Sequence, residues 1–280
     1  MDRTEAVLRR WFAALPAPAY DLGILGERGM YRLEAVPAAR ILRMLPYLRR
    51  RNAHGAHIYG RPTGESPYTL LDDAYAATLN RLTDEGFAPA AVVETSPGNF
   101  QAWLRHRQPF PKELGTLAAQ MLAERFGTDR NAADWRRFGR LPGFTNRKPQ
   151  HRDSHGLFPF VLLHGHNGEP FAAADSFHAD LLARHAQIER ERTALRLSFT
   201  NRTGHTHGTL SLPQFRGLPR YAGRPAAADM AFSVAALASG WPEQEIASAL
   251  SQDYLSRDAS PSRRAAYIRR TMAKALRWAG

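Results

Sequence analysis

The chain has 280 residues, 44% of them hydrophobic and 23% charged, a composition typical of a soluble globular protein rather than a disordered chain. It has no cysteine and no run of 18 apolar residues, and its charged first ten residues are followed by no signal-like segment; this excludes disulfides and a membrane-spanning helix and favours a cytoplasmic location. The net charge of +12 favours a polyanionic partner, nucleic acid before an anionic membrane surface, with a basic surface that serves only solubility as the alternative.

Hydrophobic spacing and turn residues predict alternating helices and strands in the first half of the chain. Apolar side chains three and four residues apart indicate helices, and short runs of branched and aromatic residues between turn formers indicate strands. In chain order, we expect a helix over 2–15, a hairpin over 19–25 and 29–33, a helix over 36–52, strands over 57–62 and 68–73, a helix over 75–85, a hairpin over 91–104 and a helix over 112–126.

Two adjacent carboxylates, Asp72 and Asp73, end the expected strand over 68–73. Side-by-side anions repel each other, and a divalent cation such as Mg²⁺, which is held by one or two carboxylates plus substrate phosphates, would relieve that repulsion. In a regular strand the two side chains would point to opposite faces, so both reach one ion only if the strand ends, twists or bulges there. The alternative is an Asp-Asp cap for the following helix.

A second segment, over 129–148, interleaves Asp134 with basic residues, aromatic residues and glycines. Basic and aromatic side chains in alternation suit phosphate contacts combined with base stacking. From this segment we single out as template contacts Arg136, Arg137, Phe144 and Asn146. A solvated charged loop over the core is the alternative.

The second half of the chain changes character. A strand over 158–163 precedes a long polar helix over 171–196, and residues 200–222 are rich in Gly, Pro and Thr and are expected to form a linker. Three helices over 228–239, 242–251 and 260–278 then predict a small helical bundle. Its last helix has a basic face that includes Arg269 and Arg270 as further DNA contacts, with a merely solvated surface as the alternative. The expected domains are residues 1–170, a connecting region over 171–222, and the bundle over 223–280.

The expected chemistry is metal-dependent nucleotidyl transfer. Asp72, Asp73 and Asp134 would hold one or two Mg²⁺ or Mn²⁺ ions, which clamp a nucleoside triphosphate and stabilise the attacking and leaving oxygens of an in-line displacement. Charge-neutralising and hydrogen-bonding groups for the triphosphate or its sugar are Ser96, Asn99, Gln101, Arg140, Arg147 and Lys148.

Three motifs carry a resemblance to a known family: Leu71-Asp72-Asp73, the segment over 92–103 and the segment over 139–148. They resemble the RepB-type plasmid primases of the MobA/RepB group, divergent members of the archaeo-eukaryotic primase superfamily. The resemblance implies an α+β fold with a mixed-sheet catalytic core flanked by helices, a long connecting helix and a C-terminal helical bundle. It also implies primer synthesis on single-stranded DNA for plasmid or mobile-element replication, with the metal carboxylates at Asp72, Asp73 and Asp134. The position that a His takes in the wider superfamily is occupied by Gln101, as in this family.

Two other functions use the same residues. A non-catalytic single-stranded DNA-binding module would keep the fold and lose the activity, but it would gain nothing from anions next to DNA. A metal-dependent nuclease would use the carboxylates without needing the triphosphate groups. Single-stranded DNA and nucleoside triphosphates are the expected partners, a replicative helicase or a relaxase is a further candidate, and the chain is expected to be a monomer.

Overall fold

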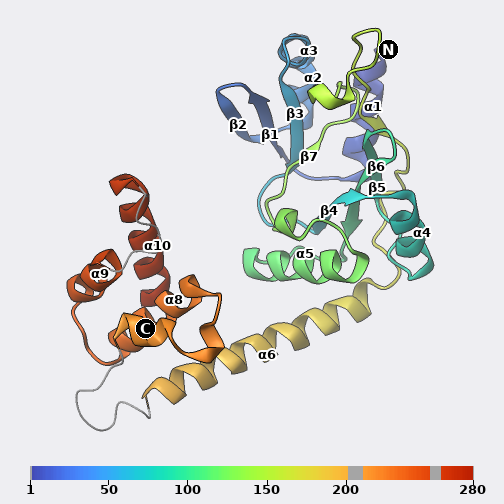
Figure 1. The fold of residues 1–280 in the computed structure, drawn as a ribbon. Helices are drawn as coiled ribbons and strands as arrows, with labels where there is room; N and C mark the ends of the chain where they lie inside the picture. Colours follow the sequence, from blue (N-terminus) through green and yellow to red (C-terminus); the bar gives the residue numbers. More distant parts are fainter. Residues whose placement is uncertain (1, 201–210, 253–259, 280) are drawn as a thin grey trace. The chain divides into compact units, whose positions relative to one another are not determined.

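The computed structural model describes residues 2–200, 211–252 and 260–279 (Figure 1). The chain divides into two compact units, Met1–His185 (unit 1) and Ala186–Gly280 (unit 2). No helix within the described ranges is long and apolar enough to cross a membrane.

Unit 1 contains two four-stranded sheets. Sheet A has the order β2-β1-β3-β7 and consists of β1 (Tyr20–Gly26), β2 (Gly29–Val36), β3 (His57–Pro62) and β7 (Gly139–Arg140). Sheet B has the order β4-β6-β5-β8 and consists of β4 (Tyr68–Ala74), β5 (Ala91–Ser96), β6 (Asn99–Arg105) and β8 (Leu162–Leu163). The pairings within both sheets are antiparallel, so the expected α+β class is confirmed, with two antiparallel sheets in place of one mixed sheet.

Helices cover these sheets. Unit 1 contains α1 (Arg3–Ala14), α2 (Ala38–Arg43), α3 (Leu45–Ala53), α4 (Ala76–Asp84), α5 (Lys112–Phe126) and the first part of α6 (Ala174–Thr200). The helix expected over 36–52 is broken at Met44, because Pro46 in the first turn of α3 has no N–H to donate and its ring would clash with the preceding turn. The strand expected over 158–163 is confined to β8, with an isolated bridge from Phe160 to Thr145.

Sheet B has a core on each face, as the alternation of its side chains requires. Leu70 and Trp103 belong to the core shared with sheet A and α1, where Trp11 packs edge-on against Trp103 at 6.2 Å between ring centroids. Leu71 and Leu104 belong to the opposite core, with residues of α4, α5 and α6. The face of β4 and β6 that carries Leu70 and Trp103 is therefore the one directed toward sheet A.

Unit 2 is helical and has its own core. It contains α7 (Leu212–Arg216), α8 (Pro225–Ala238), α9 (Glu243–Gln252) and α10 (Pro261–Ala279), with a 3-10 turn, η3, over Pro219–Tyr221. The three bundle helices are thus found where they were expected. Of the expected linker over 200–222, residues 201–210 lie outside the described ranges, and α7 and η3 occupy much of the rest.

Candidate active site

A β-bulge brings Asp72 and Asp73 to the same side of sheet B. Leu71 pairs with Ala102 and Ala74 with Phe100, so two residues of β4 oppose the single residue Gln101. Asp73 has a φ of 55°, in the left-handed region that Asp tolerates better than most residues. Without the bulge, Asp73 would follow Leu71 toward the core under α4 and α5; with it, both carboxylates line one cavity. The predicted distortion of the strand is present.

The helix-cap alternative is wrong for this pair. Helix α4 begins at Ala76, and its N-cap residue is Tyr75, with no side-chain hydrogen bond to the helix N-terminus. The carboxylates of Asp72 and Asp73 instead accept hydrogen bonds from other side chains.

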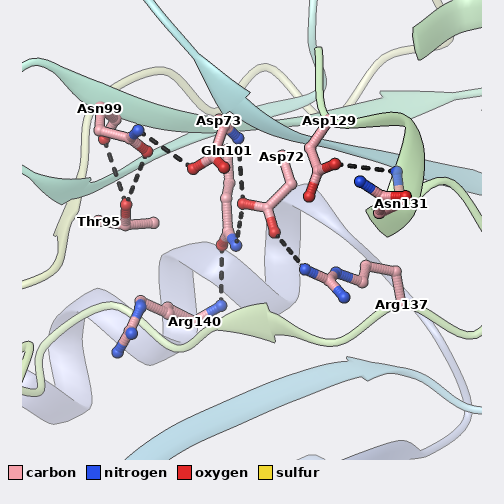
Figure 2. A network of polar contacts seen from close by, with 9 residues as sticks. All are labelled: Asp72, Asp73, Thr95, Asn99, Gln101, Asp129, Asn131, Arg137 and Arg140. Atoms are coloured by element: carbon pink, nitrogen blue, oxygen red, sulfur yellow. Dashed lines mark hydrogen bonds and ion pairs between the residues drawn. The ribbon is translucent and has the colours of Figure 1, made fainter. Parts of the chain in front are cut away.

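Figure 2 shows the polar network that holds the two carboxylates. Gln101 Nε2 donates to Asp72 Oδ1 at 3.0 Å, and Gln101 Oε1 accepts the Arg140 backbone N–H at 2.8 Å. The side-chain amide therefore has a fixed orientation, with its NH₂ group toward Asp72. Arg137 forms an ion pair with Asp72 Oδ2 at 2.8 Å. Gln101 is 3% exposed, so this bridge is buried.

Asp73 has a separate set of partners on the β5–β6 hairpin. Asn99 Nδ2 donates to Asp73 Oδ1 at 3.1 Å, and Thr95 Oγ1 donates to Asn99 Oδ1, also at 3.1 Å. Each carboxylate thus has one amide partner from β6, Gln101 for Asp72 and Asn99 for Asp73. The remaining oxygen of Asp73 accepts no hydrogen bond from the described residues.

Two acidic residues are candidates for a third carboxylate. Asp134, the predicted one, lines the same cavity, and its Oδ1 accepts the Arg136 backbone N–H at 2.8 Å. Asp129 was not predicted. Its backbone N–H donates to the Asp72 carbonyl at 3.2 Å, and its side chain lies beside Asp72 in Figure 2. The signal for Asp129 was its position directly after the end of α5, which terminates at Gly127 with a φ of 68°.

The donor set suits Mg²⁺ or Mn²⁺. No group of three or more acidic or histidine side chains within the described part of the chain is arranged to hold a metal ion by itself. Mg²⁺, however, is commonly bound by one or two carboxylates together with substrate phosphates and water. Asp72 and Asp73 provide such a pair of hard oxygen ligands, so the residues fit the ion.

The cavity between the two sheets has a volume of about 580 Å³ and brings together residues from β1 to β7. Eight predicted site residues line it: Asp72, Asp73, Gln101, Asp134, Arg136, Arg137, Arg140 and Lys148. Residues that the sequence did not single out also line it, among them Asp21, Arg32, Tyr59 and Arg61. These four come from sheet A, whose position opposite sheet B could not be inferred from strand patterns.

Arg61 organises the loop that follows Asp129. It forms a partly buried ion pair with Asp21 at 2.7 Å, and its guanidinium lies over the rings of Trp135 at 5.0 Å and Phe138 at 5.4 Å. The aromatic residues of this segment therefore already have cationic partners within the protein. Phe138 also lines the cavity.

The opposite wall of the cavity is basic, and a neutral histidine contacts one of its arginines. Burial, followed by the charges of Arg140, Lys148 and Arg147, lowers the pKa of His57 to about 4. Arg140 Nη1 lies 2.8 Å from His57 Nδ1, and the Arg147 backbone N–H donates to the same nitrogen at 3.3 Å. Because both partners are donors, His57 accepts at Nδ1 and carries its proton on Nε2. The wall thus keeps the positive charges of Arg140 and Lys148 without a carboxylate partner among the described residues.

Two predicted DNA contacts are wrong. Phe144 is 2% exposed and packs in the core between α1 and sheet A, so its ring has no face for a base. Asn146 is 1% exposed, and its Nδ2 donates to the Thr95 carbonyl at 2.7 Å, which makes it a structural residue. Sequence patterns did not separate a buried aromatic residue from an exposed one in a segment without regular secondary structure.

The other predicted residues lie outside this cavity. Ser96 is buried in the β5–β6 hairpin, and Asn99 contacts the site through Asp73. Arg147 lies over the ring of Phe158 at 4.1 Å and donates to the Ala53 carbonyl. Arg269 and Arg270 belong to α10 of unit 2.

Known proteins resemble this chain in sequence and in fold. Mobilization protein A of Escherichia coli is 30% identical over 288 residues, which cover 98% of this chain and 41% of that protein. The crystal structure of primase RepB′ is 29% identical, covers 98% of this chain and 94% of that chain, and has a TM-score of 0.66. The crystal structure of the catalytic domain of primase RepB′ in complex with initiator DNA is 33% identical, covers 68% of this chain and 98% of that chain, and has a TM-score of 0.63.

The chain spans about two fifths of the length of Mobilization protein A. The family model of the RepB DNA-primase N-terminal domain matches residues 7–191. That match covers more than half of the chain and includes the bulged strand, the hairpin over 91–105 and the basic wall. The chain belongs to the RepB primase family.

Proposed function

We propose that this protein synthesises short primers on a single-stranded DNA template by divalent-metal-dependent nucleotidyl transfer, in the replication of a plasmid or mobile element. The observation that carries the proposal is the bulge in β4, which directs two neighbouring carboxylates into one cavity opposite a wall of unpaired positive charge. A pure DNA-binding surface has no use for these carboxylates, because they repel phosphates.

Asp72 and Asp73 would hold the metal, with a third carboxylate completing the site. A bound ion would supply charge stabilisation for the attacking oxygen and for the pyrophosphate that leaves the nucleotide. Arg137 occupies Asp72 Oδ2 and keeps the paired carboxylates partly neutralised until a cation and a nucleotide arrive. Gln101 holds the other oxygen of Asp72 by a bridge to β7, which fixes the direction of the carboxylate.

Arg140 and Lys148 are placed to neutralise the triphosphate. Both line the cavity opposite the carboxylates, and Arg140 is directed by its contacts with His57 and the ring of Tyr59, 5.1 Å away. Neutral His57 accepts from Arg140 and adds no charge of its own. Ser96, Asn99 and Arg147 stay predictions as nucleotide contacts, with Asn99 acting through its hydrogen bond to Asp73.

Arg136, exposed at the cavity, is the nearest candidate template contact on unit 1. Single-stranded DNA is supported as the template by the net charge of +12 and by the relative that was crystallised with initiator DNA. A replicative helicase or a relaxase stays a candidate partner, since one relative is named a mobilization protein.

The test is incorporation of labelled nucleotides on single-stranded DNA with Mg²⁺ or Mn²⁺. The wild type should form short products, and Asp72→Asn should abolish them while binding of the template persists. Asp84→Asn, an exposed acid on α4, is the matched control and should leave synthesis unchanged. A wild type that binds DNA without making product under broad metal and template conditions would instead be the non-catalytic binding module. A wild type that cleaves the template would be the nuclease.

Two further variants identify the third carboxylate. The backbone hydrogen bond from Asp129 to Asp72 keeps Asp129 next to the carboxylate pair, whereas Asp134, which the sequence analysis predicted, lines the cavity. The two variants are Asp129→Asn and Asp134→Asn. The one that removes the third metal ligand should abolish primer synthesis as completely as Asp72→Asn does. The other variant should retain most of its primer synthesis, because the carboxylate that it removes accepts only a local backbone hydrogen bond.

A further inference from the structure

Unit 2 contains a cavity of about 700 Å³, separate in composition from the cavity between the sheets. Its floor is apolar and comes mainly from α8, through Ala227, Met230, Ala231 and Val234. Aromatic rings from three places join the lining: Tyr221 of η3, and Tyr267 and Trp278 of α10. Its volume lies in the range of pockets that hold small organic ligands.

The charged residues of the lining are all basic, and Ala226 and Thr271 complete it. Arg192 of α6, Arg224 before α8, and Arg270 and Lys274 of α10 line the cavity, and no carboxylate of the described residues does. Within the described ranges, Arg224, Arg270 and Lys274 form no ion pair, while Arg192 pairs with Glu189. Arg270 and Lys274 are four residues apart on one helix, so their side chains leave the same face as neighbours.

The cations and the aromatic ring of Trp278 form one surface. Arg192 lies over that ring at 5.3 Å from the centroid and Lys274 at 5.2 Å. Tyr267 is held by a 2.7 Å hydrogen bond from its hydroxyl to the buried carboxylate of Asp229, which also pairs with Arg216 at 2.8 Å. The ring of Tyr267 is therefore held in the cavity by a buried group of unit 2.

We propose that this cavity binds a segment of single-stranded DNA, with bases against the apolar and aromatic floor and phosphates at Arg224, Arg270 and Lys274. The inference rests on the proposed function and adds a second DNA site to it. Aromatic stacking with basic side chains along the backbone is the general mode of sequence-tolerant single-strand binding. A free nucleoside triphosphate fits less well, because it arrives with a divalent cation and no carboxylate lines the cavity to receive that ion. Duplex DNA fits less well, because its bases are stacked inside.

The test measures binding of the full chain to a short labelled single strand, without nucleoside triphosphates, at several salt concentrations. Arg270→Ala combined with Lys274→Ala should weaken binding and make the plot of log affinity against log salt shallower by about 1.4, the value for two lost single-strand phosphate contacts. Arg263→Ala combined with Lys112→Ala, which removes two positive charges outside the cavity, is the control for net charge and should leave the slope near the wild-type value.

A second variant fills the cavity without changing its charge. Ala227→Trp should weaken binding about 5- to 150-fold, the loss expected for one stacked base, while the salt slope stays as in the wild type. Thermal unfolding of each variant checks that unit 2 remains folded. If Ala227→Trp unfolds unit 2, the test depends on the charge variant alone.

Three results would overturn the inference. In the first, the charge variant (Arg270→Ala with Lys274→Ala) binds the strand as tightly as the wild type; in the second, a nucleoside triphosphate displaces the strand from the wild type but not from the charge variant. In the third, the charge variant loses as much affinity for an acidic peptide as for the strand. Failure of this inference is distinguishable from failure of the proposed function. If these variants lose DNA binding and the wild type makes no primers, the DNA site of unit 2 stands and the primase function is rejected. If the wild type makes primers and the variants bind DNA as the wild type does, the primase function stands and the DNA site of unit 2 is rejected.

Discussion

The cavity between the sheets of unit 1 and the cavity of unit 2 both have basic linings, but only the first also has carboxylates. In unit 1, Asp72 and Asp73 lie among Arg136, Arg137 and Arg140, whereas the cavity of unit 2 combines cations with apolar and aromatic side chains. Anions beside a phosphate-binding surface weaken binding unless a metal ion uses them. Carboxylates among basic residues therefore indicate a catalytic site in the cavity of unit 1. Basic and aromatic residues without carboxylates indicate a site of binding alone in the cavity of unit 2.

The polar groups of the two units also differ in how they are buried. Unit 2 buries one carboxylate completely, Asp229, which is 0% exposed and is shared by Arg216 and Tyr267. Unit 1 leaves Asp72, Asp73 and Asp134 partly or fully exposed. Around them it buries the amide of Gln101 and one paired carboxylate, Asp21. Variants that remove each kind of group should therefore act on different properties.

The largest expected effect is on the stability of unit 2. Asp229→Ala leaves Arg216 without its anion and Tyr267 without its acceptor, which should destabilise unit 2 by about 3 kcal/mol. Denaturant unfolding followed by tryptophan fluorescence should show an earlier transition for unit 2 and an unchanged one for unit 1. Glu243→Ala, an exposed acid on α9, should change neither. Equal shifts of both transitions would contradict the assignment of Asp229 to unit 2 alone.

The next effect separates the carboxylate of Asp73 from its backbone. Asp73→Asn and Asp73→Val should both reduce nucleotide incorporation, by about 10²- to 10³-fold for the loss of several kcal/mol of metal-based stabilisation. Only Asp73→Val should also destabilise unit 1, by about 1 to 2 kcal/mol, because a branched residue is strained at a φ of 55°. If the two variants unfold alike, the left-handed conformation of the bulge is not required.

A smaller effect is expected where an amide orients the carboxylate. Gln101→Leu removes the donor to Asp72 and leaves the buried Arg140 N–H without an acceptor, at a cost of about 1 to 3 kcal/mol in unfolding free energy. Nucleotide incorporation should fall through kcat, while template affinity stays near that of the wild type. Gln108→Leu, an exposed change on the same unit, is the control. Unchanged kcat would mean that Asp72 needs no partner from β6.

The effect that is smallest at neutral pH is a dependence of stability on pH that belongs to unit 1. Burial lowers the pKa of His106 to about 3, against an ordinary value of 6.5. Between these two pH values the unfolded chain is protonated at this histidine and the folded chain is not. Stability is full above pH 6.5 and is lost as the pH falls toward 3, by at most about 1.4 kcal/mol per pH unit for this histidine. His106→Gln should flatten the decline in denaturant midpoint between pH 7 and 4.5, and His166→Gln, an exposed change, should not. The described residues of unit 2 include no histidine, so its transition should lack this contribution.

Much of the fold and part of the site could be predicted from local patterns. Apolar spacing located most helices and the hairpins, because the periods of helices and strands depend only on neighbouring residues. Asp72 and Asp73 could be identified because two adjacent anions at a strand end are conspicuous in any context. Asp129 was missed because an acid after a helix is a common turn residue, and only its contact with Asp72 distinguishes it. Phe144 and Asn146 were misassigned because their burial comes from chain segments far away in sequence.

By itself, the sequence determined the positive net charge of the chain, the order of the elements and the need for a distortion at Leu71–Asp73, since these follow from composition and local backbone geometry. The tertiary structure alone decided that Gln101 faces the bulge, that sheet A supplies the far wall of the cavity, and that Arg270 rather than Arg269 lines a cavity in unit 2. The physical reason is that strand register and helix packing are set by the burial of distant side chains against one another, which no short stretch of the chain encodes.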